Sequence, residues 1–150
     1  MSLLGDGSKV AVMAMLEVLI IDLSTSTTVT SIRRLSAPKA VVGVEGRSYV
    51  IIHFCDNYCM VYDINRYEIV YIIIGVFSDH NGIKASANGY HLLYGNNTAI
   101  QMWSMAGCQI EMLSHQFKFI SSYAINFDGS EIYLGNYYGE IHFVKAIALK

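Results

Sequence analysis

The stretch Gly82–Trp103, GIKASANGYHLLYGNNTAIQMW, contains the pattern that decides the fold. Its apolar run His91–Gly95 lies between two polar turns, Asn88-Gly89 and Asn96-Asn97-Thr98. Glycine accepts a positive φ at no steric cost, so an Asn-Gly pair beside an apolar run predicts a hairpin turn. A further strand ends on Trp103, the only tryptophan of the chain. The stretch therefore predicts three consecutive antiparallel strands.

The same pattern recurs along the chain with a period of 41 residues. Counting in steps of 41 from Trp103 reaches Tyr62 and Ile21 upstream and Val144 downstream, and each of these four anchors ends or lies within an apolar run. Turn pairs that end in glycine recur before the anchors, at Asp6-Gly7, Glu45-Gly46, Asn88-Gly89 and Asp128-Gly129. The period divides the chain into four repeats, at about residues 1–35, 36–76, 77–116 and 117–150, each with about four strands. The strand that ends at the anchor is expected to be buried on both faces.

The repeat resembles that of WD-repeat β-propellers, whose blades are four-stranded antiparallel units of roughly forty residues. The resemblance covers about residues 5–148 and implies an all-β fold of propeller blades. Three features depart from the family pattern. The Gly-His pair of the family is reduced to Asp79-His80 in the third repeat and missing elsewhere, Asn97 replaces its aspartate, and Leu93 replaces its small hydroxyl residue. The residues that carry the resemblance are His80, Gly82-Ile83, Asn88-Gly89, Leu92-Leu93, Asn97, Ile100, Trp103, Asp128-Gly129, and Asp22 and Asp63 after their anchors.

The two ends of the pattern predict an incomplete propeller in a single 150-residue segment. Only the stub Met1–Leu4 precedes the first turn, and the last repeat stops at Lys150 without a fourth strand. Pro38 is expected in a connection between strands. We therefore expect roughly fourteen strands, in a piece of a larger propeller, a truncated product or a half that associates with another chain. A closed four-bladed ring is disfavoured, because its first and last blades would each lack a strand.

The composition limits the classes of function. A formal net charge of −2 gives no general attraction to nucleic acid. A hydrophobic share of 53% indicates strands buried on both faces, or an apolar surface that a partner covers. The longest apolar run, Val10–Ile21, is too short to span a bilayer and contains Glu17. With three cysteines and no signal peptide, we expect a cytoplasmic protein.

No constellation of residues predicts catalysis, a metal or a cofactor. His53, Cys55 and Cys59 are close in sequence but one ligand short of a tetrahedral zinc site. We interpret the two cysteines as small apolar residues beside a hairpin turn. The aspartates fall mostly at turns or just after anchors, where they have a local hydrogen-bonding role. The glycines are dispersed and form no phosphate-binding loop.

The loops point to a non-catalytic scaffold that binds a protein or peptide. Aromatic side chains in loops on a rigid scaffold offer large contact areas at small entropic cost, whereas Trp103 is expected in the core. The alternative is a phosphoinositide-binding propeller that uses Arg33 and Arg34, because paired guanidinium groups suit phosphates. Self-association, or further blades that complete the propeller, would supply other partners. The predicted binding residues are Arg33, Arg34, Tyr58, Phe77, His80, Asn97, Tyr137 and Tyr138.

Overall fold

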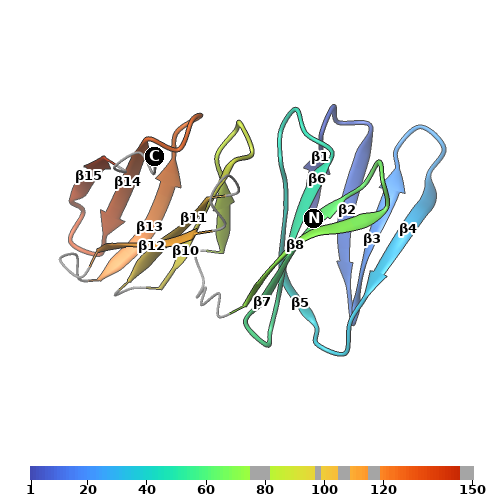
Figure 1. Ribbon diagram of the computed structural model, residues 1–150, viewed down its shortest axis with the longest axis horizontal. Helices are drawn as coiled ribbons and strands as arrows, with labels where there is room; N and C mark the ends of the chain where they lie inside the picture. The colour runs from blue at the N-terminus through green and yellow to red at the C-terminus, as the bar shows by residue number, and fades with distance from the viewer. Residues whose placement is uncertain (75–81, 97–98, 105–108, 115–118, 146–150) are drawn as a thin grey trace. The chain divides into compact units, whose positions relative to one another are not determined.

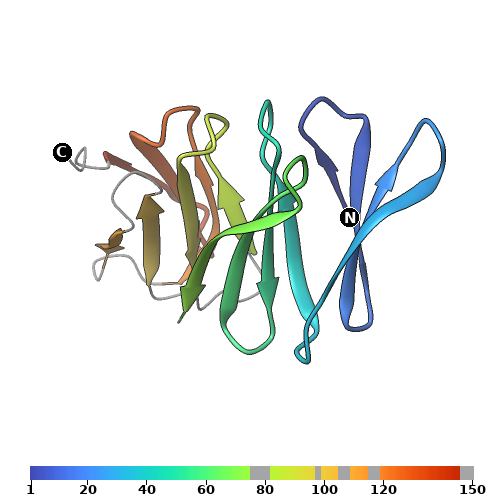
Figure 2. The same cartoon turned by 45° about the vertical axis from the view of Figure 1, so that its right-hand side comes forward.

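The chain forms four antiparallel β-sheets. The computed structural model describes residues 1–74, 82–96, 99–104, 109–114 and 119–145, and these residues form fifteen strands and no helix. The strands group into two compact units, Met1–Val76 and Phe77–Lys150, called unit 1 and unit 2. The boundary between the units coincides with the predicted boundary between the second and third repeats. Figures 1 and 2 show two sheets in each unit.

Unit 1 contains two four-stranded sheets whose strands follow one another in chain order. Each strand pairs antiparallel with the next, so every connection within a sheet is a hairpin. Sheet 1 consists of β1 (Ser2–Leu4), β2 (Lys9–Ala14), β3 (Glu17–Asp22) and β4 (Thr27–Arg33). Sheet 2 consists of β5 (Pro38–Gly43), β6 (Tyr49–Phe54), β7 (Tyr58–Asp63) and β8 (Glu68–Ile74).

Unit 2 repeats this arrangement with one strand fewer among the residues described. Its sheets are again antiparallel and ordered along the chain. Sheet 3 consists of β9 (Ile83–Ala85), β10 (His91–Gly95), β11 (Ile100–Ser104) and β12 (Gln109–Ser114). Sheet 4 consists of β13 (Ile120–Ile125), β14 (Glu131–Asn136) and β15 (Ile141–Lys145).

The strand register follows the 41-residue period at the anchors. Each anchor lies opposite an apolar residue of the preceding strand, in the pairs Ile21–Val10, Tyr62–Val50, Trp103–Leu92 and Val144–Ile132. The irregularities recur as well. The pairing of β3 with β4 shifts between Ile20 and Ile21, and that of β7 with β8 shifts 41 residues later, between Val61 and Tyr62.

Two expectations about the first half of the chain were wrong. The stub before the first turn is the strand β1, in which Leu3 pairs with Val10, so sheet 1 is complete. Pro38 does not lie in a connection but begins β5, opposite Phe54 and beside a bulge. The first position of a strand tolerates proline, because the missing N–H interrupts little of the ladder there. β1 raises the number of strands in the described residues from the expected fourteen to fifteen, and the place of Pro38 leaves that number unchanged.

The aspartates after the first two anchors close equivalent turns. Asp22 Oδ1 accepts hydrogen bonds from the backbone N–H groups of Ser24 (2.8 Å) and Thr25 (3.3 Å). Asp63 Oδ1 accepts the same pair from Asn65 (2.9 Å) and Arg66 (3.2 Å). Such Asx turns satisfy backbone donors that the reversal of the chain leaves unpaired. The predicted local role of these carboxylates is therefore confirmed.

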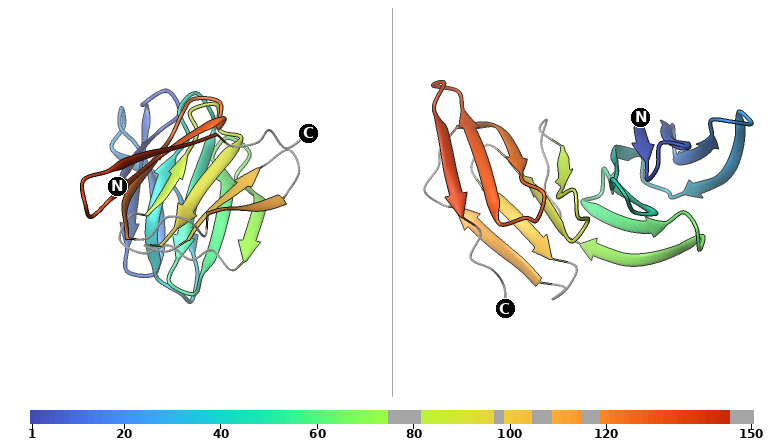
Figure 3. Two further views of the ribbon diagram at one scale, coloured as in Figure 1. Left: turned by 90° about the vertical axis from the view of Figure 1, so that its left-hand side faces the viewer. Right: turned by 90° about the horizontal axis from the view of Figure 1, so that it is seen from above.

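The hydrophobic cores lie between the two sheets of each unit. In unit 1, Val18 and Ile20 of sheet 1 join Val50, Ile52 and Phe54 of sheet 2 in one buried cluster. The right-hand panel of Figure 3 shows sheets 1 and 2 from above as neighbouring layers. Unit 2 has an equivalent cluster between sheets 3 and 4. Trp103 is buried, with 4% of its surface exposed, and so belongs to the interior as expected.

The third strand of sheet 4 is not buried on both faces. In the earlier repeats the residues at these positions are inaccessible to solvent, whereas Ile141 and Phe143 of β15 are 80% and 50% exposed. Tyr133 of β14 lies beside Phe143, with ring centroids 5.5 Å apart, and is itself 40% exposed. The expectation of burial on both faces is therefore wrong for β15.

Candidate functional site

The two-residue turn between β2 and β3 carries apolar side chains where polar ones are usual. Its residues, Met15 and Leu16, are 90% and 50% exposed. The carbonyl of Leu16 accepts a hydrogen bond from the backbone N–H of Arg34 (3.2 Å), which fixes the loop after β4 against this turn. Leu35, the next residue of that loop, is fully exposed. Three apolar side chains therefore lie in solvent at one end of unit 1.

Arg34 is held between sheets 1 and 2 by an acidic and an aromatic partner. Its Nη2 lies 2.8 Å from Oδ2 of Asp56, and its Cζ lies 3.6 Å from the ring centroid of Tyr58. Phe54 is a second aromatic neighbour, at 5.2 Å from Cζ and with its ring edge-on to Tyr58. A guanidinium over an aromatic face is attracted by the ring quadrupole. Arg34 and Tyr58 thus form one fixed cluster.

Arg33 has a different environment. Its Nε donates to Oε2 of Glu17 (2.7 Å), and the hydroxyl of Ser31 donates to the same oxygen. These hydrogen bonds, that of Ser31 first and that of Arg33 second, lower the pKa of Glu17 below its ordinary value. The Arg33 side chain is nevertheless 77% exposed, so its remaining guanidinium donors face solvent. Arg33 can therefore contact a bound group.

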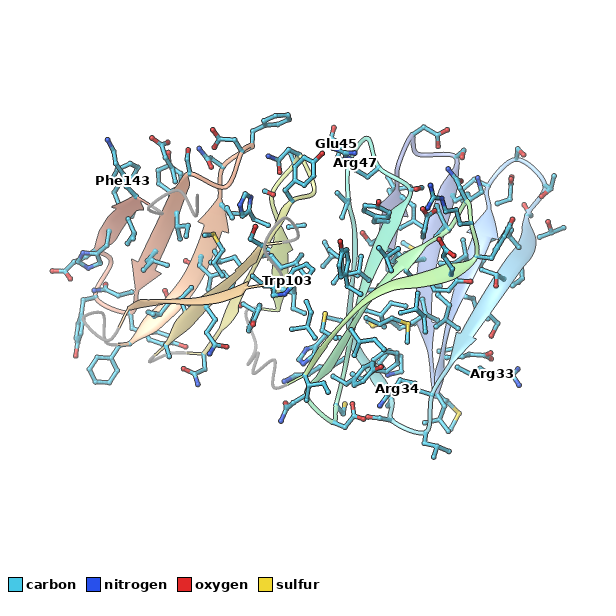
Figure 4. The ribbon with its side chains drawn as sticks, viewed as in Figure 1. Arg33, Arg34, Glu45, Arg47, Trp103 and Phe143 are labelled. Carbon is cyan, nitrogen blue, oxygen red and sulfur yellow. The ribbon has the colours of Figure 1, made fainter. Side chains whose placement is uncertain are left out.

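A hollow lies at the end of unit 1 that carries Arg33 and Arg34, which we call the arginine end. The hollow has a volume of about 740 Å³ and a mostly apolar wall. Figure 4 shows Arg33 and Arg34 at this end of the unit 1 sheets, and Glu45 and Arg47 at the opposite end. The residues that line the hollow are Ala14, Met15, Leu16, Glu17, Arg33, Arg34 and Leu35.

Of the eight predicted binding residues, three lie at or beside this hollow, two belong to unit 2 and three lie outside the described residues. Arg33, Arg34 and Tyr58 come from loops or strand ends that the fold gathers at the arginine end. Tyr137 and Tyr138, each 71% exposed, belong to a turn of unit 2, where the ring of Tyr138 lies edge-on to Phe119 at 5.6 Å. The other predicted residues, Phe77, His80 and Asn97, lie outside the described residues.

A second, smaller hollow lies at the opposite end of unit 1. It has a volume of about 260 Å³ and is mostly polar, with Asp6, Lys9 and Arg47 among its lining residues. The Asp6 carboxylate accepts a hydrogen bond from the backbone N–H of Ser8 (2.9 Å), so it closes its own turn. We assign no ligand to this hollow.

The cysteines do not form a reactive or metal-binding centre in the described part of the chain. His53 and Cys59 are buried opposite each other on β6 and β7, while Cys55 is exposed in the turn between them. Burial raises the pKa of Cys59 to about 12, so its thiol stays protonated at neutral pH. Among the residues described, no group of three or more potential ligands could hold a metal ion.

Sequence reasoning missed the apolar rim of the hollow and the acidic partners of the arginines. Two features of the sequence could have indicated the apolar rim. Met15-Leu16 occupies a turn between two apolar runs, and Leu35 follows a pair of charged residues, so each apolar residue stands where a polar one is usual. The pairing of Arg34 with Asp56 joins residues 22 positions apart and needs the two sheets in place.

Comparisons with known proteins support the fold. No family model matches the sequence, and no curated protein matches it. Among solved structures, hydrazine synthase of Kuenenia stuttgartiensis is similar, with a TM-score of 0.74 and 16% sequence identity. The match covers 96% of this chain and 44% of that chain, so this chain spans less than half of its length. The chain is thus an all-β protein built from β-propeller blades.

No helix in the described ranges has the length and apolar character needed to cross a bilayer.

The ion pair between Arg34 and Asp56 predicts a displaced titration. The hydrogen bond from Arg34 is the largest cause that holds the pKa of Asp56 below its ordinary value of 3.8. A carboxyl with a lowered folded-state pKa contributes stability above its unfolded value, and that contribution is lost as the pH falls through the folded value. We expect the ¹³C NMR titration midpoint of the Asp56 carboxyl below 3.8, and a rise toward 3.8 in the Arg34→Ala variant.

Glu17 is the internal control for this titration. Its partners are Ser31 and Arg33, so its midpoint should stay below its ordinary 4.5 in the Arg34→Ala variant. An unchanged Asp56 midpoint in the variant would show that Arg34 is not its partner in solution.

Proposed function

We propose that the chain is a non-catalytic binding module that takes up a protein or peptide at the arginine end of unit 1. The observation that carries the proposal is the exposure of Met15, Leu16 and Leu35 around a fixed arginine–aromatic cluster. A contiguous group of exposed apolar side chains often marks a binding surface. A rigid support reduces the entropy lost on binding.

The chemistry of the hollow suggests the type of ligand. The side chains of Met15, Leu16 and Leu35 suit an apolar residue of the partner. Arg33 is exposed beside them and can donate hydrogen bonds to an acidic residue or a chain carboxylate. Arg34 has a structural role, because its guanidinium is already engaged by Asp56 and Tyr58. We therefore propose an extended peptide with adjacent apolar and acidic groups.

Membership of the WD-repeat family and an intracellular location are parts of the same proposal. The 41-residue period and the conserved geometry of the turns after Asp22 and Asp63 support the family, whose members commonly act as interaction scaffolds. In unit 2, Tyr137 and Tyr138 offer a further aromatic contact for a partner. Fold alone does not choose the partner.

Substitution of Leu35 tests the arginine end. A peptide selected from a random display library against the full chain would be labelled, and its affinity measured by fluorescence anisotropy. Leu35→Glu places a charge in the centre of the apolar rim, and we expect it to weaken binding by about tenfold or more. The substitution should leave folding intact, because the Leu35 side chain is fully exposed.

Leu23→Glu is the matched control. Leu23 is also an exposed leucine, at 49%, but it follows β3 at the other end of sheet 1. Binding should be unchanged in this variant. Equal affinities of the Leu35→Glu variant and the native chain, or failure to select any peptide, would contradict the proposal.

The alternative is binding of a phosphoinositide headgroup by Arg33 and Arg34. The exposed guanidinium of Arg33 favours this function, whereas the ion pair of Arg34 with Asp56 opposes it. Flotation with vesicles that contain a phosphoinositide distinguishes the two functions. Flotation that the Arg33→Ala, Arg34→Ala pair abolishes would establish lipid binding, and flotation indifferent to the pair would exclude it.

A further inference from the structure

The two sheets of each unit pack through the same pair of faces. In unit 1 the contact face of sheet 1 includes Ala11, Val18 and Ile20, and that of sheet 2 includes Val50, Ile52 and Tyr62. In unit 2 the corresponding residues, each 82 positions later, are Leu93, Ile100 and Met102 of sheet 3 and Ile132, Leu134 and Val144 of sheet 4. We call the first type of surface face A and the second type face B. Face A of one sheet packs on face B of the next.

Within the described part of unit 2, no sheet covers face A of sheet 4. Its residues Tyr133, Ile141 and Phe143 are 40%, 80% and 50% exposed. The equivalent residues Ile100 and Met102 of sheet 3, 41 positions earlier, are only 0% and 2% exposed because sheet 4 covers them. Figure 4 shows the Phe143 side chain beside β14 and β15. An apolar surface of this kind is therefore left in solvent.

Face B of sheet 1 takes no part in the core cluster between sheets 1 and 2. Val10, Val12 and Ile21 occupy the positions that Val50, Ile52 and Tyr62 occupy in sheet 2. Leu19 lies opposite Val12 on the same face, and Leu3 lies opposite Val10. Leu3 is 64% exposed, Val12, Leu19 and Ile21 are half-buried, and Val10 is buried. The chain therefore carries both halves of a contact that it already makes twice.

We propose that face A of sheet 4 packs on face B of sheet 1 of a second copy of this chain. The occupant is a second copy because a surface that packs on face A must have the side-chain pattern of face B. Sheet 1 of this chain has that pattern on the face that lies outside the core cluster of unit 1. The contact is head-to-tail, and in the proposed dimer each copy supplies one face A and one face B. The inference is independent of the proposed ligand, since Leu19 and Phe143 do not line the arginine-end hollow.

The molar mass of the full chain in solution tests the inference. Light scattering coupled to size-exclusion chromatography should give twice the 16.7 kDa of one chain. Phe143→Glu on face A and Leu19→Glu on face B should each give monomers. Leu19 suits the test because its equivalent in sheet 3 is Gln101, a polar residue that the strand accommodates. A monomeric native chain would overturn the inference, whether the chain stays open or closes on itself.

Mixing the two variants separates this contact from other modes of association. The Phe143→Glu chain keeps an intact face B, and the Leu19→Glu chain keeps an intact face A. An equimolar mixture should therefore regain a dimer through one native contact, which also shows that both variants are folded. A contact between two identical faces predicts that at least one variant alone stays dimeric, and this result would overturn the inference.

Ile74→Lys is the control for charge on an exposed strand. Ile74 is 77% exposed, much like Ile141, but it ends the edge strand β8 and belongs to neither face A of sheet 4 nor face B of sheet 1. This variant should keep the native mass, and circular dichroism should show the same β-sheet signal in all variants. Loss of the dimer in Ile74→Lys would assign association to the strand edge and overturn the inference.

Discussion

Replacement of Phe54 by alanine is expected to lower the free energy of unfolding by about 4 kcal/mol, which is typical of deleting a buried aromatic ring. Phe54 ends β6 with none of its surface exposed and belongs to the core cluster between sheets 1 and 2. Its ring also supports Tyr58, with ring centroids 6.2 Å apart. The substitution would remove both contacts and leave a cavity that the two sheets cannot fill. Urea denaturation followed by circular dichroism measures the change.

Phe127→Ala is the matched control for this prediction. Phe127 is a phenylalanine of unit 2 that is 69% exposed, so its truncation should change the free energy of unfolding by less than about 0.5 kcal/mol. A similar loss of stability in the two variants would contradict the assignment of Phe54 to the core. The Phe54→Ala variant should also weaken binding at the arginine end, because Tyr58 and Arg34 lose their support.

Gly43→Ala is expected to destabilise the chain by about 3 kcal/mol, the upper range for overpacking a tight contact. A Cβ atom on Gly43 would lie 2.0 Å from the carbonyl oxygen of Leu3 and 2.9 Å from Cδ2 of Leu4. The first of these atoms is backbone, so β1 and β5 would have to move apart. That movement would also disturb the hydrogen bond from the Gly43 N–H to Oγ of Ser2 (2.8 Å).

Gly7→Ala separates the steric cost at Gly43 from the general cost of removing a glycine. Gly7 has a φ of +81° and no atom within 4 Å of an added Cβ, so alanine there incurs only the left-handed backbone cost of about 1 kcal/mol. Thermal and urea unfolding should rank Gly43→Ala well below Gly7→Ala in stability. The reverse order would show that β1 does not lie against β5 in solution.

Much of the fold follows from local sequence, for identifiable reasons. β10 was predicted at its observed bounds, His91–Gly95, because a turn containing Gly89 precedes the apolar run and a second polar turn follows it. β1 was predicted only as a stub, because three residues are too few to show a strand period. Its formation depends on pairing with β2 and on contact with β5. Pro38 was misplaced because proline disfavours strand interiors, whereas this one occupies the first position of its strand.

The candidate site was only partly predictable. Arg33, Arg34 and Tyr58 could be proposed from residue type and loop position, and the structure places them at one end of unit 1. The partners Glu17 and Asp56 lie 16 and 22 residues away from their arginines, so they depend on strand pairing and on the packing of sheet against sheet. The exposure of Ile141 and Phe143 could not be predicted, because both residues are apolar and the equivalent positions of the other repeats are buried.

The edge strand β8 has a consequence for the behaviour of the chain at high concentration. Its sequence EIVYIII contains one charged residue, Glu68, and Ile69, Ile72 and Ile74 are 50%, 50% and 77% exposed. Sheet edges are usually protected by lysine, proline or a bulge that interrupts further pairing. β8 contains neither lysine nor proline, and its bulge, opposite Val61 and Tyr62, leaves Ile72 and Ile74 in the regular part of the strand. Short β-branched segments of low charge are also the segments that stack into cross-β fibrils. A charged residue at Ile72 would act as a gatekeeper there and extend the concentration range over which the chain remains free of fibrils.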